Sequence, residues 1–477
     1  ILGIRQPDSG EVFILGENPN ELKHKFITGA FLQKLKLPPN WDQEMLIQLI
    51  ESHYPKTLGK VNSILNEFQL SQTKNSENLK PEKVKSLAGG EENILFFALA
   101  QAGFPKVLIL DEPSSNLSVK NQKKMWNQVQ NFIDQGNTVL FVCHDPEDQI
   151  DIKPNKILLL ENGQVTLIEE SQNCLEESRQ TELNNFEPRI GLYHWITLLF
   201  QYIKFTILQT LKTDRNYLIL TFLAGIIFST LISLLPQLSL DLDKATSLIF
   251  YSFYFVLTAI TMTGNIVSEE RQNETLTKIT KILPLPPIIY ISAKVVVSLF
   301  FTSILILLML TTFFVINGVS PLIWQSPLEF IKFISSILHL LPEILTLSIG
   351  FIIGLIPYVF LGVTLGYLFG QKSIQIIGLI CCAALAIPIY IRYILEFLES
   401  SLQLSNKWIK LAELAGDYLA AYSPFYHYSQ IILFLEKRPE YDQYILVHIV
   451  GFIWFTVIAL MITLLTYRYI FTKEVKA

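Results

Sequence analysis

The distribution of apolar residues divides the chain into two parts. Before residue 190 the apolar residues come in short runs or at helical spacing, whereas after it they form six long segments. Each segment approaches or exceeds the ~20 residues that a helix needs to cross a bilayer core. We therefore predict an all-α membrane domain with six transmembrane helices. The predicted spans are Tyr217–Leu235, Leu248–Val267, Ile288–Ile316, Ile344–Leu368, Ser373–Leu395 and Tyr444–Tyr467.

Short strands and amphipathic helices alternate in the first part of the chain. Val107–Leu110 and Thr138–Val142 are apolar runs typical of strands in a parallel sheet that is covered on both faces. Lys120–Asp134 lies between them with helical spacing, so the three segments form a predicted βαβ unit. An Asn162-Gly163 turn then joins two strands of a predicted hairpin. The first part is predicted to be an α/β domain.

The charges follow the same division. Residues 1–190 hold 19 of the 37 Lys and Arg residues and 26 of the 42 Asp and Glu residues. Only 17% of all residues are charged, against ~25% in typical soluble proteins. No segment has the basic excess of a protein that binds nucleic acid, and four cysteines are too few for a disulfide scaffold. The composition favours a soluble domain joined to a membrane domain.

Asp111 and Glu112 directly follow the apolar strand at 107–110. Ligands bind at the carboxyl ends of strands in open α/β sheets. An Asp at that place can hold Mg²⁺, and a Glu can orient or deprotonate an attacking water. Taken alone, the dipeptide is more often a simple acidic turn.

Each of three further features, taken alone, says little about function. The sequence Leu87–Glu91 contains two adjacent glycines before a helix predicted over Asn93–Ala102, where backbone N–H groups can approach a phosphate. His144 follows a predicted strand, and Gln33 is an isolated glutamine. Each of these is structural in most proteins.

In this order, however, the segments together resemble the nucleotide-binding domain of ABC transporters over about residues 1–170. Leu87–Glu91 is similar to the signature loop, Val107–Glu112 to the Walker B strand and Ser114–Ser118 to the D-loop. Gln33 then corresponds to the glutamine of the Q-loop, and His144 to the switch histidine.

The resemblance implies that ATP and Mg²⁺ are bound between two such domains, with the signature loop of one facing the nucleotide of the other. It implies two catalytic residues, Glu112 acting on water and His144 contacting the γ-phosphate. Asp111 and Gln33 would serve Mg²⁺. The implied nucleotide-binding residues are Gln33, Ser86, Leu87, Ala88, Gly89, Gly90 and Glu91.

The sequence departs from the family pattern in three places. The 477 residues contain no G-x-x-x-x-G-K followed by Ser or Thr, and we expect that this loop was truncated just before Ile1. The 477-residue chain should therefore bind ATP poorly. The signature Ser is Ala88, its Gln is Glu91, and the Asp of the D-loop is Ser118. A slow, divergent ATPase and neutral drift explain these exchanges equally well.

The second part resembles the permease of type-2 ABC exporters. A polar stretch at 268–276 is similar to the E-R-x-x-G-T-L pattern of their cytosolic loop, with Glu274 in place of the Gly. Tyr418–Tyr428 is similar to the segment before their last span. The loop is either a lever that docks on the ATP-binding domain or a solvated connector.

We predict three domains: an ATP-binding domain at 1–170, a linker with an interfacial helix at 171–215, and a permease at 216–477. Within the linker, Trp195–Leu211 is an apolar helix. It either lies along the cytosolic membrane surface or packs against the soluble domain.

These features predict one half of an ATP-driven ABC transporter, acting as an exporter in a homodimer or in a heterodimer with a homologous half. The alternative is a hydrolysis-deficient partner or a regulatory membrane subunit. An importer is less favoured by the permease resemblance. Six spans place both ends on one side, so the ATP-binding domain and the C-terminus are expected in the cytosol, with the permease in the plasma (inner) membrane.

Overall fold

The protein forms two compact units that do not simply follow chain order. The computed structural model describes residues 2–3, 7–16, 18–19, 21–32, 42–54, 59–70, 87, 89–142, 152, 154–170, 191–234, 244–272, 283–318, 327–370, 373–384, 424–435 and 445–473. The first unit is Ile1–Phe205 with Asn273–Tyr290 and Glu474–Ala477, and the second is Thr206–Gln272 with Ile291–Lys473. The domain boundaries at residues 170 and 215 remain predictions.

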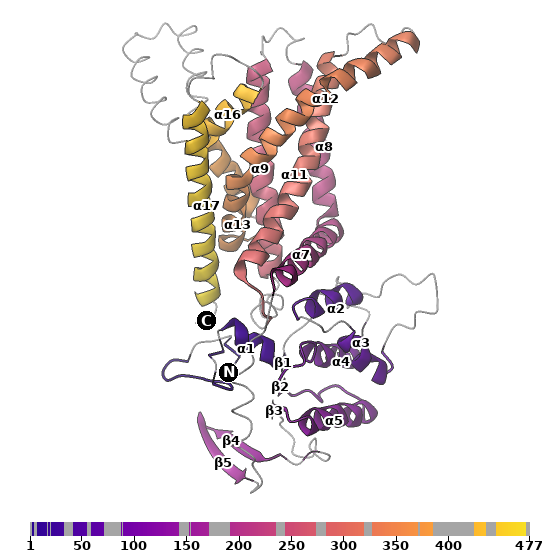
Figure 1. Ribbon diagram of the computed structural model, residues 1–477, viewed down its shortest axis with the longest axis vertical. Coiled ribbons are helices and arrows are strands. Elements are labelled where there is room, and N and C mark those ends of the chain that lie inside the picture. The colour runs from indigo at the N-terminus through magenta and orange to yellow at the C-terminus, as the bar shows by residue number, and fades with distance from the viewer. Residues whose placement is uncertain are drawn as a thin grey trace. The chain divides into compact units, whose positions relative to one another are not determined.

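A parallel three-stranded sheet lies at the core of the first unit. Its order is β1 (Thr28–Phe31), β2 (Val107–Asp111) and β3 (Thr138–Val142). The first four residues of β2 are buried, as expected for an apolar central strand. Helix α5 (Val119–Asp134) joins β2 to β3, which confirms the predicted βαβ unit. In Figure 1, α3 (Lys60–Glu67), α4 (Gly89–Ala100) and α5 stack along one side of this sheet.

Acidic side chains accept hydrogen bonds from the N-terminal amides of two helices in the first unit. Asp42 Oδ1 accepts from the N–H groups of Glu44 and Met45 and so caps α2 (Gln43–Glu51). The buried Glu51 carboxylate accepts from the N–H groups of Gly59 and Val61, both at 2.9 Å. This carboxylate satisfies amides at the start of α3, which otherwise have no partner within the helix.

The remaining elements of this unit complete the α/β domain. They are α1 (Leu22–Ile27), α3 (Lys60–Glu67), α4 (Gly89–Ala100) and a hairpin of β4 (Lys156–Glu161) and β5 (Gln164–Glu170). Asn162 and Gly163 both have positive φ values, 52° and 77°, which a two-residue hairpin turn of type I′ requires. The predicted hairpin is confirmed.

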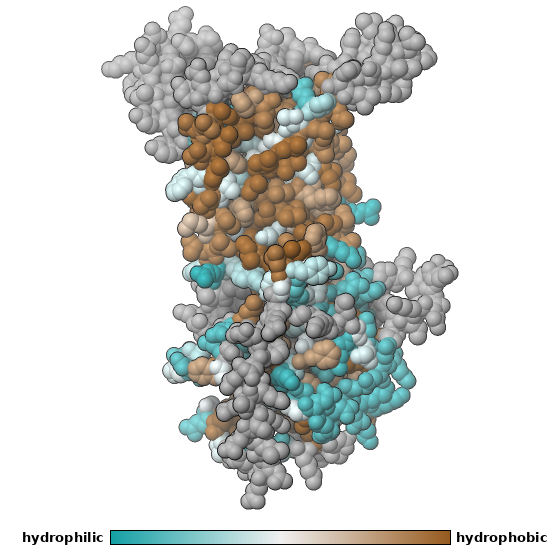
Figure 2. All heavy atoms as spheres, in the orientation of Figure 1, coloured by the Kyte–Doolittle hydropathy of each residue, from teal (hydrophilic) through white to brown (hydrophobic). Residues whose placement is uncertain are grey.

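Long helices make up the second unit. Helix α7 (Leu192–Thr213) leads into it from the first unit and is followed by α8 (Arg215–Leu234). The later helices are α9 (Lys244–Gln272), α11 (Pro287–Gly318), α12 (Pro327–Gly354), α13 (Ile356–Leu368), α16 (Pro424–Leu435) and α17 (Ile445–Lys473). Figure 2 shows that hydrophobic residues dominate the visible face of these helices.

Four helices in the described part of the chain are long and apolar enough to cross a membrane. The end of α12 and α13 form a further candidate that is bent by 41° near Leu355, so five spans can be counted. The fifth predicted span, Ser373–Leu395, is described only as the short apolar helix Ser373–Ala384, and its remainder lies outside the described residues. The count of six therefore stays a prediction.

Helix α9 is the centre of the second unit. In the 18-residue apolar stretch that marks its candidate span, 78% of the residues are buried, against 28% for the corresponding stretch of α8 and 6% for that of α17. Helix α13 packs closely on it, because Gly362 and Gly366 face the backbone of α9. A Cβ atom added at either glycine would lie 2.7 Å from a carbonyl oxygen, that of Ile260 or that of Gly264. Such pairs of small residues four positions apart let membrane helices touch through their backbones.

Candidate functional site

The carboxyl end of β2 places two acidic side chains at the edge of the sheet. Asp111 ends the strand, and Glu112 follows with a φ of 49°, which is uncommon for a residue other than glycine. The Glu112 N–H donates to the Val142 carbonyl at 3.0 Å, and the Glu112 carbonyl accepts from the Ser115 hydroxyl at 2.9 Å. A left-handed residue costs about 1–3 kcal/mol and persists where its surroundings hold it. Both acidic residues are half-buried.

The loop after Glu112 packs against the first turns of α4. The Asn93 side-chain amide donates to the Ser115 carbonyl at 2.6 Å. Gly90 lies so close to the loop that an added Cβ would be 2.8 Å from the Asn116 carbonyl oxygen. Since backbone cannot move aside as a side chain can, Gly90 is required by this packing. The structure thus joins the predicted signature helix to the predicted D-loop.

The two glycines of the predicted signature loop lie within the helix and not in a loop before it. Helix α4 begins at Gly89, so Gly89 and Gly90 form its first turn. None of the described residues lies within 4 Å of a Cβ added at Gly89, so they leave the amide end of the helix open on that side. Backbone N–H groups at such an end can bind an anion. Glu91, in the same turn, adds a negative charge that opposes it.

Four of the predicted site residues, Gln33, Ser86, Ala88 and His144, lie outside the described residues. Leu87 is described and half-buried. Oxygen donors are the ligands that Mg²⁺ prefers, and the Asp111 carboxylate supplies one at the sheet edge. Among the described residues no group of three His, Cys, Asp or Glu side chains could hold a metal ion, so Asp111 is the described residue that fits Mg²⁺.

A second polar cluster in the first unit was not predicted from the sequence. His53 is fully buried, with Nδ1 2.8 Å from the Leu49 carbonyl oxygen and Nε2 2.8 Å from the Tyr202 hydroxyl. Because a carbonyl oxygen only accepts, Nδ1 carries the proton, and the Tyr202 hydroxyl donates to Nε2. Burial lowers the pKa of His53 to about 4, so its imidazole is neutral at pH 7.

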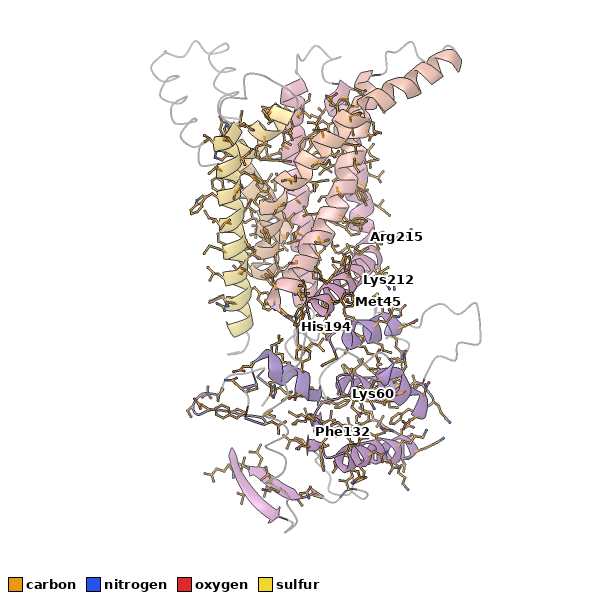
Figure 3. All side chains as sticks on the ribbon, viewed as in Figure 1. Met45, Lys60, Phe132, His194, Lys212 and Arg215 are labelled. Atoms are coloured by element: carbon orange, nitrogen blue, oxygen red, sulfur yellow. The ribbon has the colours of Figure 1, made fainter. Side chains whose placement is uncertain are left out.

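This cluster joins three segments that are distant in the sequence. Nε2 of His194, near the start of α7, lies 3.2 Å from the His53 carbonyl oxygen, and burial lowers the pKa of His194 as well. The Tyr202 ring meets the ring of Tyr290, at the start of α11, with 6.4 Å between centroids. Figure 3 labels His194 on α7. The end of α2, the first half of α7 and the start of α11 are therefore packed together.

Comparison with known proteins identifies the N-terminal region. A family model described as ABC transporter matches residues 1–115. The N-terminal region is an ABC transporter nucleotide-binding domain. A sulfate/thiosulfate import ATP-binding protein of Chlorella vulgaris, itself a probable assignment by its name, is 28% identical over 39% of this chain and 78% of its own. Protein white of Drosophila melanogaster is 30% identical over 24% of this chain and 17% of its own.

The matches to ABC proteins concern this region rather than whole proteins. The chain covers between 53% and 64% of the next curated ABC relatives. A solved ATP-binding cassette of an ABC transporter in its ADP conformation is 18% identical over 36% of this chain and 73% of its own, with a TM-score of 0.26. A structural similarity this low says nothing about the fold of this chain. The apolar helices of the second unit fit a membrane domain fused to the ABC domain.

Proposed function

We propose that this chain is one half of an ATP-driven ABC transporter. The observation that carries the proposal is the left-handed Glu112 at the carboxyl end of the central strand β2, directly after Asp111. An acidic side chain held at some conformational cost at a ligand-binding edge is typical of a catalytic position. The match of residues 1–115 to the ABC transporter family supports it.

The roles follow from the chemistry of each side chain. The Asp111 carboxylate would hold Mg²⁺, which neutralises phosphate charge when it is bound. The Glu112 carboxylate accepts a proton from, or orients, the water that attacks the γ-phosphate of ATP. Gln33 and His144 would complete the contacts to metal and phosphate, and Ser86, Leu87 and Ala88 would act with the amides of Gly89 and Gly90.

In this proposal the first turn of α4 contacts one nucleotide, while Asp111 and Glu112 at the end of β2 contact another. The first turn of α4 would face the phosphate bound by a second domain, so two halves are needed for each complete site. A homodimer supplies them most simply. A heterodimer would let the partner provide a signature loop without the acidic Glu91.

Substitution of Glu112 tests the catalytic assignment. In the full-length protein, Glu112→Gln should lower ATP turnover by roughly 10²–10⁴ while nucleotide binding persists, because loss of a general base has effects of that size. Glu44→Gln is the matched control, since Glu44 is exposed on α2, where its carboxylate accepts from the Gln48 amide one turn further on. Turnover of Glu112→Gln within about twofold of the wild type would remove Glu112 from the mechanism.

A hydrolysis-deficient partner or regulatory subunit is the second candidate, favoured by Ala88, Glu91 and Ser118. The substitution Ala88→Ser separates the two. In an active pump it should leave turnover unchanged or raise it, because a hydroxyl adds a donor near the γ-phosphate. If the protein binds ATP but hydrolyses none with either Ala or Ser at position 88, it is the hydrolysis-deficient subunit.

Direction and location also belong to the proposal. The names of the relatives include import proteins and a Nod factor export protein, so they do not favour one direction. The permease resemblance favours export through the plasma membrane, with the ATP-binding domain on the cytosolic side. The loop between α9 and α11 would then couple hydrolysis to the permease.

A further inference from the structure

Two histidines from different helices face each other in the second unit. His427 is buried in the first turn of α16, and His448 is half-buried in the first turn of α17. Their Nδ1 atoms are 3.0 Å apart, and their ring centroids are 5.2 Å apart. Figure 1 shows α16 beside the end at which α17 begins. We call the two side chains the histidine pair.

The packing around the histidine pair fixes this contact. A Cβ added at Gly451, on α17, would lie 2.8 Å from Nε2 of His427, so the glycine leaves room for the His427 ring on the helix backbone. The ring of Phe455 lies beside His427, with 5.9 Å between centroids, and that of Tyr426 lies beside His448, with 5.5 Å. The contact between the two Nδ1 atoms is therefore a packed feature of the interface between α16 and α17.

The strength of this contact depends on how many protons the histidine pair holds. A hydrogen bond needs one nitrogen that donates its N–H and one that accepts with a lone pair. In the uncharged pair, one imidazole carries its proton on Nδ1 and the other on Nε2. A first added proton makes the donor cationic and leaves the acceptor in place, and charged donors form the stronger hydrogen bonds. A second added proton removes the acceptor and brings two N–H groups and two positive charges face to face.

Few other described groups can change charge near the histidine pair. The described side chains of α16, α17 and the helices packed on them, α9, α12 and α13, include two more charged residues, Glu343 and Arg468. Arg468 is exposed near the other end of α17. Glu343 precedes Gly350 of α12, which lies against Leu435 in the last turn of α16, whereas the histidine pair is at the first turn. The other titratable groups there are tyrosines, including the neighbouring Tyr426, and cysteine-free helices of this kind otherwise titrate near pH 10.

Apolar and aromatic contacts hold α16 on its other side. Gly350 of α12 lies against Leu435, and Gly354 lies against the ring of Tyr428. The rings of Phe351 and Tyr428 meet edge to face, with 6.1 Å between centroids. Because these contacts carry no charge between pH 4 and pH 8, α16 should stay on α12 when its contact with α17 is lost.

We propose that the histidine pair is a pH-sensitive contact that joins α16 to α17 near neutral pH and releases it when both imidazoles are protonated. The start of α17 then separates from α16, which keeps its place on α12. In the predicted topology of six spans, this end of α17 faces away from the cytosol, so the pair would respond to acid outside. The inference rests on the packing of the second unit and not on the proposed ATPase, so either can fail alone.

Distances between spin labels test the release directly. The full chain, with its native cysteines replaced, carries labels at Gln430→Cys on α16 and Val450→Cys on α17, in nanodiscs whose two faces meet the same buffer. Pulsed electron resonance measures the separation from about pH 8 to about pH 4.5, a range that contains the ordinary titration of histidine. The separation should be constant near neutral pH and become longer at the acid end. Labels at Gln430→Cys and Ile349→Cys, on α12, should keep one separation throughout.

A variant that can hold only one charge distinguishes the histidine pair from other effects of acid. Asn places an amide near the position of Nδ1, where it can donate or accept the same hydrogen bond but never becomes charged. His448→Asn should therefore keep the separation of α16 and α17 over the whole pH range. His194→Asn removes a histidine of the first unit and is the matched control, which should release α17 as the wild type does.

Each of four outcomes would overturn the proposal. A constant separation in the wild type down to about pH 4.5 would mean that acid does not break the contact. Equal release in His448→Asn would assign the effect to other groups. A longer separation between Gln430→Cys and Ile349→Cys would mean that acid loosens the whole bundle. Release by EDTA at neutral pH would mean that a metal ion, and not a hydrogen bond, joins the imidazoles.

Discussion

His53 is a histidine whose ordinary titration is suppressed by its surroundings. Its two ring nitrogens are both engaged, one by the Leu49 carbonyl and one by the Tyr202 hydroxyl. Protonation would add a donor at Nε2, where the hydroxyl already donates, and would place a charge in a buried position. The neutral form is therefore part of the folded structure.

The stability of the first unit should depend on pH through this residue. The pKa of His53 falls from 6.5 in the unfolded chain to about 4 in the fold, so the unfolded state binds more protons between these values. Stability is full above pH 6.5 and is lost as pH falls towards 4, by at most about 3 kcal/mol. Thermal unfolding followed by fluorescence should show a shallower fall of Tm in His53→Gln than in the wild type. Parallel curves would assign the acid sensitivity to other groups.

The Tyr202 hydroxyl should stabilise the same cluster. Tyr202→Phe keeps the ring contacts but leaves the buried Nε2 of His53 without a donor, which costs about 1–3 kcal/mol. Tyr193→Phe removes a hydroxyl from an exposed ring on the same helix and is the control. We expect a lower Tm for Tyr202→Phe alone, and an equal Tm for the two variants would contradict the assigned hydrogen bond.

Among the elements, the contact of α13 with α9 is the most extensive between helices of the described residues. Gly366→Val should separate the two helices, because its Cβ would lie 2.7 Å from the Gly264 carbonyl oxygen and from Val267. Overpacking of this kind costs about 1–3 kcal/mol or more. Gly191→Val is the control, since no atom of the described residues lies within 4 Å of a Cβ there. The measurement is Tm and monodispersity in detergent, and a wild-type result for Gly366→Val would argue against this packing.

Elements with a local signature could be predicted from the sequence. The βαβ unit and the hairpin have short apolar runs, helical spacing and an Asn-Gly turn, all of which act over a few residues. The apolar spacing places the start of α4 too late, because Gly89 and Gly90 are weak helix formers that tertiary packing nevertheless holds in the first turn.

The contacts between distant segments could not be predicted in this way. His53 and Tyr202 are 149 positions apart, and no local pattern pairs them. The glycines of α13 are visible in the sequence, but which helix they face depends on the fold. At the candidate site, Asp111 and Glu112 were found through strand position and family order, whereas the left-handed backbone of Glu112 appears only in three dimensions.

For the whole molecule, the number of spans decides on which side the chain ends. Six spans place the C-terminus with the ATP-binding domain, and five would place it opposite. In a cysteine-free background, Lys476→Cys and Lys120→Cys should both react with a membrane-impermeant maleimide in inside-out vesicles and not in right-side-out ones. Asp243→Cys, between α8 and α9, should show the reverse. Labelling of Lys476→Cys together with Asp243→Cys would mean an odd number of spans.

Because α9 is largely buried and α17 is largely exposed, the two helices should differ in how many amino-acid substitutions they tolerate. Within an 18-residue apolar stretch of α17 only 6% of the residues are buried, and the buried side chains of the whole helix include Thr463 and Tyr467. Its exposed positions, such as Leu446, Val450 and Leu465, are thus constrained only to be apolar, and Leu, Ile, Val and Phe are interchangeable there. Helix α9, 78% buried over a stretch of the same length, must fit neighbours on almost every side. Over many generations the last helix should therefore accumulate apolar exchanges that α9 does not tolerate.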